Sequence, residues 1–160
     1  MLMQQQILVL MRMHELEKSL GELYALFSEK FPEYSKLWDH LGREEQNHAE
    51  AVRKLYQESY KGEVVFEEGN IKAEGVQSVI DYVKETSSLT TRGQLSAVKA
   101  LSITYDIEGS VLDKTIFKHF RVTPQFVDTI RMLQQETQGH AQMAKDELDK
   151  VPRAGVRKAG

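Results

Sequence analysis

The sequence LGREEQNHAE, residues 41–50, lies in a segment whose apolar residues recur with the period of an α-helix. The apolar stripe of this segment consists of Tyr34, Leu37, Trp38, Leu41, Val52 and Leu55. Continued through its gap, the stripe passes over Glu45 and His48. Burying an ionised carboxylate costs several kcal/mol unless it is paired or bound to a metal. These two residues therefore require partners elsewhere in the chain.

Three further segments carry a helical stripe that polar residues interrupt. The interrupting residues are Glu17 in residues 3–30, Glu108 in residues 91–120, and Glu136 and His140 in residues 124–150. The apolar residues of the three stripes are Leu10, Met13, Leu20, Tyr24, Phe27 and Phe31; Leu95, Val98, Leu101, Tyr105, Leu112 and Ile116; and Phe126, Ile130, Leu133, Met143 and Leu148. Four long helices, each with one buried face, predict an all-α protein.

The connections indicate how these helices are arranged. Pro32 ends the first helix, because the residue before a proline avoids the helical region, and the short turn predicts two antiparallel neighbours. Residues 61–90 are too long for a tight turn. We interpret them as a crossover with an extended or irregular part, a short extra helix over residues 72–86, and a polar break at residues 87–91. The predicted architecture is a four-helix bundle with a long crossover connection.

Composition and charge narrow the class of protein. The 160-residue chain has a net charge of −3, which gives no electrostatic reason to expect nucleic acid or a membrane as partner. It has no cysteine, which excludes thiolate metal sites and a cysteine nucleophile and fits a cytoplasmic protein. No apolar run reaches the roughly 18 residues that span a bilayer, and we interpret the start as the first helix rather than a signal peptide. We expect one domain over residues 1–150 and a disordered basic tail over residues 151–160.

The two halves of the chain repeat one pattern. Glu17 and His48 are 31 residues apart, and Glu108 and His140 are 32 residues apart. In each half, a helix with one buried glutamate precedes a helix whose glutamate and histidine share a face, three or four residues apart. The set comprises Glu17, Glu45, His48, Glu108, Glu136 and His140. Four carboxylates and two imidazoles match the two-metal site of bundle proteins, and donors without thiolate suit iron, manganese or zinc.

Four motifs carry a resemblance to a known family: EKSLGELY from Glu17 to Tyr24, Glu45-Gln-Asn-His48-Ala49, Glu108, and His140-Ala141. In these motifs, and over about residues 5–150, the chain resembles the ferritin-like superfamily and its rubrerythrin-related single-domain group. The resemblance implies a ferritin-like bundle, a two-iron centre that reacts with peroxide or dioxygen, and often a homodimer. It also implies that the ligands include Glu17, Glu45, His48, Glu108 and His140.

The chain departs from the family pattern at two positions. The extra third-helix glutamate of rubrerythrins is replaced by Val111. The fourth helix should read Glu-x-x-His, but Thr137 lies three residues before His140, and Glu136 lies four before it. Either Glu136 still reaches the site through its long side chain or a local helix bulge, or the site is lopsided and binds one metal weakly or not at all. We take Glu136 as a ligand.

Two functions of different classes remain open. The first is a redox enzyme that reduces peroxide or oxidises Fe(II). Because the cysteine-ligated iron domain of a rubrerythrin is missing, its electrons would come from an external donor such as a rubredoxin-like protein. The second is a non-catalytic ferritin-like protein with a degraded metal site, serving iron handling or protein interaction. In either case we expect Tyr24 and Tyr105 to lie in the core near the carboxylates, and the remaining histidines, His14, His40 and His119, to lie at the surface or just outside the site.

Overall fold

The computed structural model describes residues 4–67, 69–110 and 116–152, and these residues are predominantly helical. The α-helices are α1 (Gln4–Lys30), α2 (Ser35–Ser59), α3 (Ala73–Thr91), α4 (Ala97–Glu108) and α6 (Val127–Asp149). Short 3-10 helices cover Pro32–Tyr34, Ile116–His119 and Pro124–Phe126. Strands β1 (Val64–Phe66) and β2 (Phe120–Val122) pair antiparallel. The predicted all-α class is confirmed. None of the described helices is both long and apolar enough to cross a membrane.

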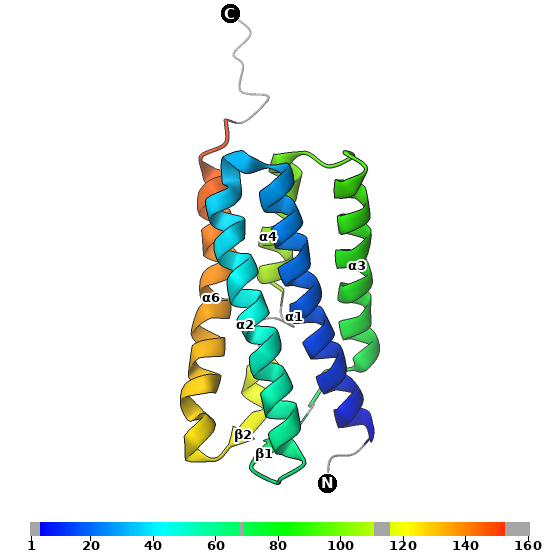
Figure 1. Ribbon diagram of the computed structural model, residues 1–160, viewed down its shortest axis with the longest axis vertical. Helices are drawn as coiled ribbons and strands as arrows, with labels where there is room; N and C mark the ends of the chain where they lie inside the picture. Colours follow the sequence, from blue (N-terminus) through cyan, green and yellow to red (C-terminus); the bar gives the residue numbers. More distant parts are fainter. Residues whose placement is uncertain (1–3, 68, 111–115, 153–160) are drawn as a thin grey trace, which may run out of the picture.

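The long helices stand side by side along the long axis of the molecule (Figure 1). Helix α1 packs against α2 and α3, α2 also contacts α6, and α6 contacts α4. The turn at Pro32–Tyr34 makes α1 and α2 antiparallel neighbours, as the sequence predicts. Helix α3 then carries the chain back to the end where α2 began, so that α4 runs in the same direction as α2 (Figure 1).

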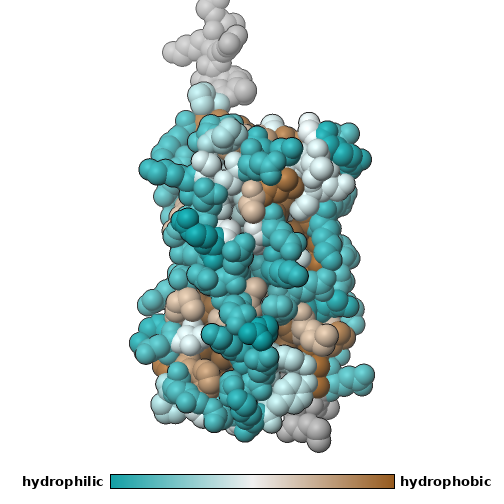
Figure 2. Space-filling view, viewed as in Figure 1, coloured by the Kyte–Doolittle hydropathy of each residue, from teal (hydrophilic) through white to brown (hydrophobic). Residues whose placement is uncertain are grey.

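Two apolar clusters fill the interior, and a layer of buried polar side chains lies between them. Along α1, Met13 of the first cluster precedes Glu17, and Leu20 of the second cluster follows it. Along α2, which runs the other way, Leu41 of the second cluster comes before the polar layer and Val52 of the first comes after it. The polar layer consists of Glu17, Glu45, His48, Glu108, Thr137 and His140. The face shown in Figure 2 is mainly hydrophilic, with scattered apolar patches.

The predicted third helix, residues 91–120, is wrong at both ends. Gly93 has a φ of +70°, which favours glycine and separates α3 from α4. Helix α4 begins after Ser96, whose side chain caps it by accepting a hydrogen bond from the Lys99 backbone N–H. It ends at Glu108, and residues 120–122 pair as a strand with Val64–Phe66. A strand partner more than 50 residues away in the chain replaces the expected helix.

The predicted buried stripe of this helix is also displaced. Val98 and Tyr105 are 44% and 39% exposed. The buried face of α4 is formed instead by Ala100, Leu101, Ile103, Thr104, Ile107 and Glu108. Leu112 and Val111 lie outside the described residues. The predicted stripe joins residues that do not belong to one helix, because Leu95 precedes α4 and Ile116 begins a separate 3-10 helix.

The extra helix is longer than the predicted residues 72–86. Helix α3 spans 19 residues and runs through residues 87–91, the predicted polar break. The hydroxyls of Thr86, Ser87, Thr90 and Thr91 donate hydrogen bonds to backbone carbonyls four residues earlier. These side chains satisfy their polar groups inside the helix instead of capping a new one. At the fourth helix, Pro124–Phe126 is a 3-10 turn, and α6 follows from Val127. The expected tail beyond residue 152 lies outside the described residues.

Candidate metal centre

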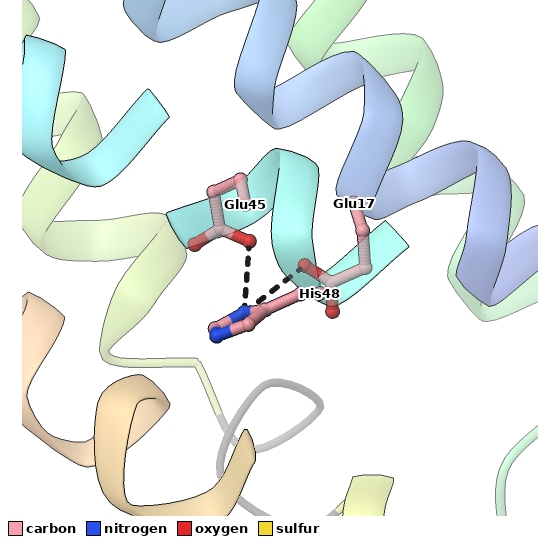
Figure 3. Close-up of side chains that lie close together, drawn as sticks. All are labelled: Glu17, Glu45 and His48. Carbon is pink, nitrogen blue, oxygen red and sulfur yellow. Dashed lines mark ion pairs between the residues drawn. The ribbon is translucent and has the colours of Figure 1, made fainter. Parts of the chain in front are cut away.

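One group of predicted site residues joins α1 and α2. Glu17, Glu45 and His48 are each at most 2% exposed, and each offers a donor atom within 4.8 Å of the others. Nδ1 of His48 lies 3.4 Å from Oε2 of Glu45 and 3.9 Å from Oε2 of Glu17. Figure 3 shows the two carboxylates converging on this nitrogen from neighbouring helices. The three-residue spacing of Glu45 and His48 puts both on the face of α2 that packs inward.

A second group joins α2, α4 and α6. Glu45, Glu108 and His140 are also buried, with donor atoms within 4.8 Å of one another. Nδ1 of His140 lies 2.8 Å from Oε1 of Glu45 and 3.3 Å from Oε2 of Glu108. Glu45 therefore belongs to both groups and presents one carboxylate oxygen to each histidine. The rings of His48 and His140 are stacked, with their centroids 5.5 Å apart and their planes inclined by 13°.

Glu136, the sixth predicted ligand, lies outside both groups. Its Oε2 is 2.7 Å from Nε2 of His48, and its side chain is 28% exposed. Thr137 occupies the buried position that Glu-x-x-His would give to a carboxylate, and it is 4% exposed. Glu136 thus contacts the ring nitrogen of His48 that does not face the buried carboxylates. Its role as a direct ligand stays a prediction that this geometry does not favour.

Sequence reasoning gave no role to Glu44, which the structure brings to the edge of the site. Oε2 of Glu44 is 2.5 Å from Nε2 of His140, and Oε1 is 3.1 Å from Nε2 of His40. A signal was present, because aligning the His-Ala pairs of the two halves places Glu44 opposite Glu136. The alignment does not predict what Glu44 contacts, because the contact runs from α2 to α6 and depends on how the helices pack.

The two tyrosines differ in their placement. The hydroxyl of Tyr24 donates a hydrogen bond of 2.5 Å to Oε1 of Glu108, so its expected contact with a site carboxylate is confirmed. Tyr105 is exposed on α4, and its predicted place in the core is wrong. His14 is half-buried on α1, with Nδ1 2.9 Å from the carbonyl oxygen of Ala49. It belongs to neither of the two groups found among the described residues, as expected for a histidine outside the set.

An aromatic wall borders the first group. The ring of Phe117 meets the ring of His48 edge-on, with centroids 6.3 Å apart and planes at 75°. Phe117 packs on Phe120, which in turn packs on Phe66 of the paired strand. The small sheet therefore closes the end of the molecule below the site. Such a wall keeps water from the histidine and strengthens electrostatic interactions inside.

The charges in the polar layer shift one another's pKa. Burial raises the pKa of Glu45, but hydrogen bonds with Glu17 and the two histidines outweigh it and hold this pKa well below its usual range. Burial lowers the pKa of His48, but its carboxylate neighbours, Glu45 first, raise it overall. For His140, Glu108 and Glu45 outweigh burial and raise the pKa to about 12. Without a metal, the Nδ1 proton of His140 thus stabilises the buried carboxylates.

The donor set fits two metal ions. Three buried carboxylates and two imidazole Nδ1 atoms converge from four helices, and these oxygen and nitrogen donors suit iron, manganese or zinc. Divalent cations would balance the buried negative charge and replace the Nδ1 protons. Glu45 would help to hold both ions, because Oε2 faces His48 and Oε1 faces His140.

Protein-family models, curated proteins and solved structures were compared with the chain, and none of them matches it. The centre is therefore interpreted from its own residues and their geometry.

Proposed function

We propose that the chain is a ferritin-like, rubrerythrin-related protein that binds two iron ions and acts in peroxide reduction or Fe(II) oxidation. In this proposal α1, α2, α4 and α6 form the four-helix bundle, and α3 is the crossover. The observation that carries it is the pair of buried Glu/His groups that share Glu45. Manganese or zinc would fit the same donors.

The residues would divide the work as follows. Glu17 and His48 would hold one ion, Glu108 and His140 the other, and Glu45 would hold both. Hydrogen peroxide takes up two electrons and two protons to become two waters, and two bound Fe(II) ions would supply both electrons at one place. Since the chain has no cysteine to hold a second redox centre, the electrons that restore Fe(II) would come from an external donor such as a rubredoxin-like protein. A homodimer remains part of this proposal.

A shallow groove lies near the second group. It lies between α4 and α6, has a volume of about 330 Å³, and is lined in part by Tyr105, Gly109, Gln138 and Ala141. Gly109 follows Glu108 in the chain, and Ala141 follows His140. Neither Glu108 nor His140 lines the groove, and both are 0% exposed. Peroxide that enters here would therefore need a local movement of α4 or α6 to reach the second group.

The test is an anaerobic Fe(II) titration, followed by stepwise addition of hydrogen peroxide. We expect about two irons per chain, and a near-ultraviolet band of Fe(III) that reaches its maximum at one peroxide per two irons. Glu45→Ala should lose the stoichiometric response. The matched control is Glu50→Ala on the same helix, because Glu50 is exposed and pairs only with Arg53 among the described ion pairs. An unchanged Glu45→Ala titration would refute the assignment.

A non-catalytic function is the second candidate, and Thr137 favours it. This position is buried but offers no carboxylate, so α6 contributes only His140 to the two groups. One iron or none per chain, with no response to peroxide, would support a protein of iron handling or protein interaction. Two irons with a full response would exclude it.

A further inference from the structure

We propose that the exposed face of α4 is a docking surface for a second copy of the chain, which binds antiparallel around a two-fold axis near Ser102. The inference rests on the proposed function only in its expectation of a homodimer, to which it gives an interface. It does not require the metal centre, because the candidate ligand on α4, Glu108, is fully buried and lies away from this face.

Helix α4 has one side that the rest of the chain leaves uncovered. The helix packs mainly against α6, and in Figure 1 it is drawn behind α1, with α6 on one side and α3 on the other. Its uncovered side carries Val98, Lys99, Ser102, Tyr105 and Asp106. At about 100° per residue, these positions fall within an arc of about 120°. Ser102 is partly exposed, and the other four residues are exposed.

Two rows of side chains run along this face, and the members of each row are about two helical turns apart. One row consists of Val98 and Tyr105, which are 44% and 39% exposed. The other consists of Lys99 and Asp106, which carry opposite charges. Within the described parts of the chain, neither charge belongs to an ion pair. Ser102 lies between the two rows and midway along them.

This arrangement is complementary to its own reversed copy. A two-fold axis that crosses the helix direction makes the two α4 helices antiparallel and brings each row against the same row of the second copy. With the axis at Ser102, Lys99 of each copy lies beside Asp106 of the other. In the apolar row, Val98 of each copy lies beside Tyr105 of the other. A parallel pair would place equal charges at the same level and would lose both pairings.

The charges of the face argue for a second copy as the partner. One lysine and one aspartate give the face no net charge, so it offers no net field to a strongly acidic or basic partner. The reversed copy carries the opposite charge at each of the two positions, at the same spacing along the helix. Charge complementarity therefore selects the antiparallel pair.

The surface on both sides of α4 adds to the area available for contact. A stable dimer buries at least about 1,200 Å² in total, and α4 is only 12 residues long. The groove of about 330 Å³ lies on the α6 side, and another of about 340 Å³ lies on the α3 side. The second groove is lined in part by Asp106 and by Tyr82, which is 43% exposed. The ring of Tyr82 therefore extends the apolar surface next to the charged row.

Sedimentation equilibrium of the metal-free full chain measures the dimer directly. We expect a dimer, which Lys99→Asp or Asp106→Lys should each weaken by about 10-fold or more, because each substitution turns two attractive contacts into two repulsive ones. The double variant with both substitutions recreates the complementary pattern and should restore the dimer. Glu50→Lys on α2 is the matched control, because it reverses an exposed charge on another helix.

The absence of cysteine allows a second test, which reports the position of the axis. Ser102→Cys places a single thiol beside the two-fold axis, where it meets the same thiol of the second copy. A short bifunctional maleimide should therefore join the chains into covalent dimers. Glu50→Cys, with an equally unique thiol on α2, should remain largely uncrosslinked at the same protein concentration.

Two results would overturn the proposal. One is a chain that stays monomeric at every concentration. The other is a dimer that neither single charge reversal weakens and that Ser102→Cys does not crosslink, because its interface would then lie elsewhere. All samples are metal-free, so either result leaves the iron titration as an independent test of the metal centre.

Discussion

Lowering the pH from 8 to 6 should weaken metal binding by about two to four powers of ten. In the metal-free protein, Nδ1 of His140 donates to Oε1 of Glu45 at 2.8 Å, and the His140 pKa is raised to about 12. A metal that binds this nitrogen must displace its proton across the whole range. Each displaced proton changes the binding free energy by about 1.4 kcal/mol per pH unit. His140 alone accounts for a factor of about 100 over two units.

His48 accounts for the rest of the expected change in metal affinity between pH 8 and pH 6. Its pKa is raised above the usual 6.5, so it also competes with the metal near neutral pH. If both histidines stay protonated throughout, the product of the two dissociation constants changes by about 10⁴, or about 5 kcal/mol. The sign follows from the metal requiring an unprotonated nitrogen, so affinity falls as pH falls.

The assay is a Co(II) titration at pH 6, 7 and 8, followed through the visible bands of the bound ion. Calorimetry in two buffers of different ionisation enthalpy counts the protons released. His140→Gln should reduce that count by one. His14→Gln should leave it unchanged, because the His14 ring contacts the backbone carbonyl of Ala49 and belongs to neither group. Equal dissociation constants at pH 6 and pH 8, with no proton released, would refute the reasoning.

Three further outcomes follow from the same geometry. Glu17→Ala and Glu45→Ala should each lose at least one metal per chain, and two metals retained in both folded variants would contradict the site. Tyr24→Phe removes the hydroxyl that donates a hydrogen bond to buried Glu108. Urea unfolding of the metal-free variant should therefore give a free energy of unfolding lower by about 2 kcal/mol. An unchanged free energy would show that this hydrogen bond does not stabilise the fold. The raised pKa of His140 contributes stability that is complete below about pH 6.5 and is lost as the pH rises toward 12. The urea concentration at the unfolding midpoint of the metal-free form should therefore be lower at pH 9 than at pH 6. A urea midpoint that is higher at pH 9 than at pH 6 would contradict a protonated His140 in the folded, metal-free protein.

Periodicity alone predicted α1 and α2 closely. The first helix, expected over residues 3–30, lies over Gln4–Lys30, and α2 at Ser35–Ser59 follows the short turn predicted at Pro32. Long helices with one apolar face carry their signal in every turn, and proline marks the break between them. The same reasoning failed after Glu108, because the strand at Phe120–Val122 depends on Val64–Phe66. No local pattern reports a partner so far away in the chain.

The sequence by itself determined five of the six polar residues of the buried layer, although Glu136, predicted with them, is 28% exposed and Thr137 is buried beside it. Glu17, Glu45, His48, Glu108 and His140 interrupt apolar faces at helical spacing, and each of them is buried in the polar layer. This could be read locally, because the spacing of residues on a helix sets the face on which they lie.

Only the tertiary structure showed how these residues share their partners. It placed Glu45 between the two histidines, and it turned Glu44 and Glu136 toward the opposite helix. The rotation and separation of packed helices set the direction in which a long side chain finds its partner. Those quantities arise from the packing of the whole molecule, and the spacing of residues along one helix does not determine them.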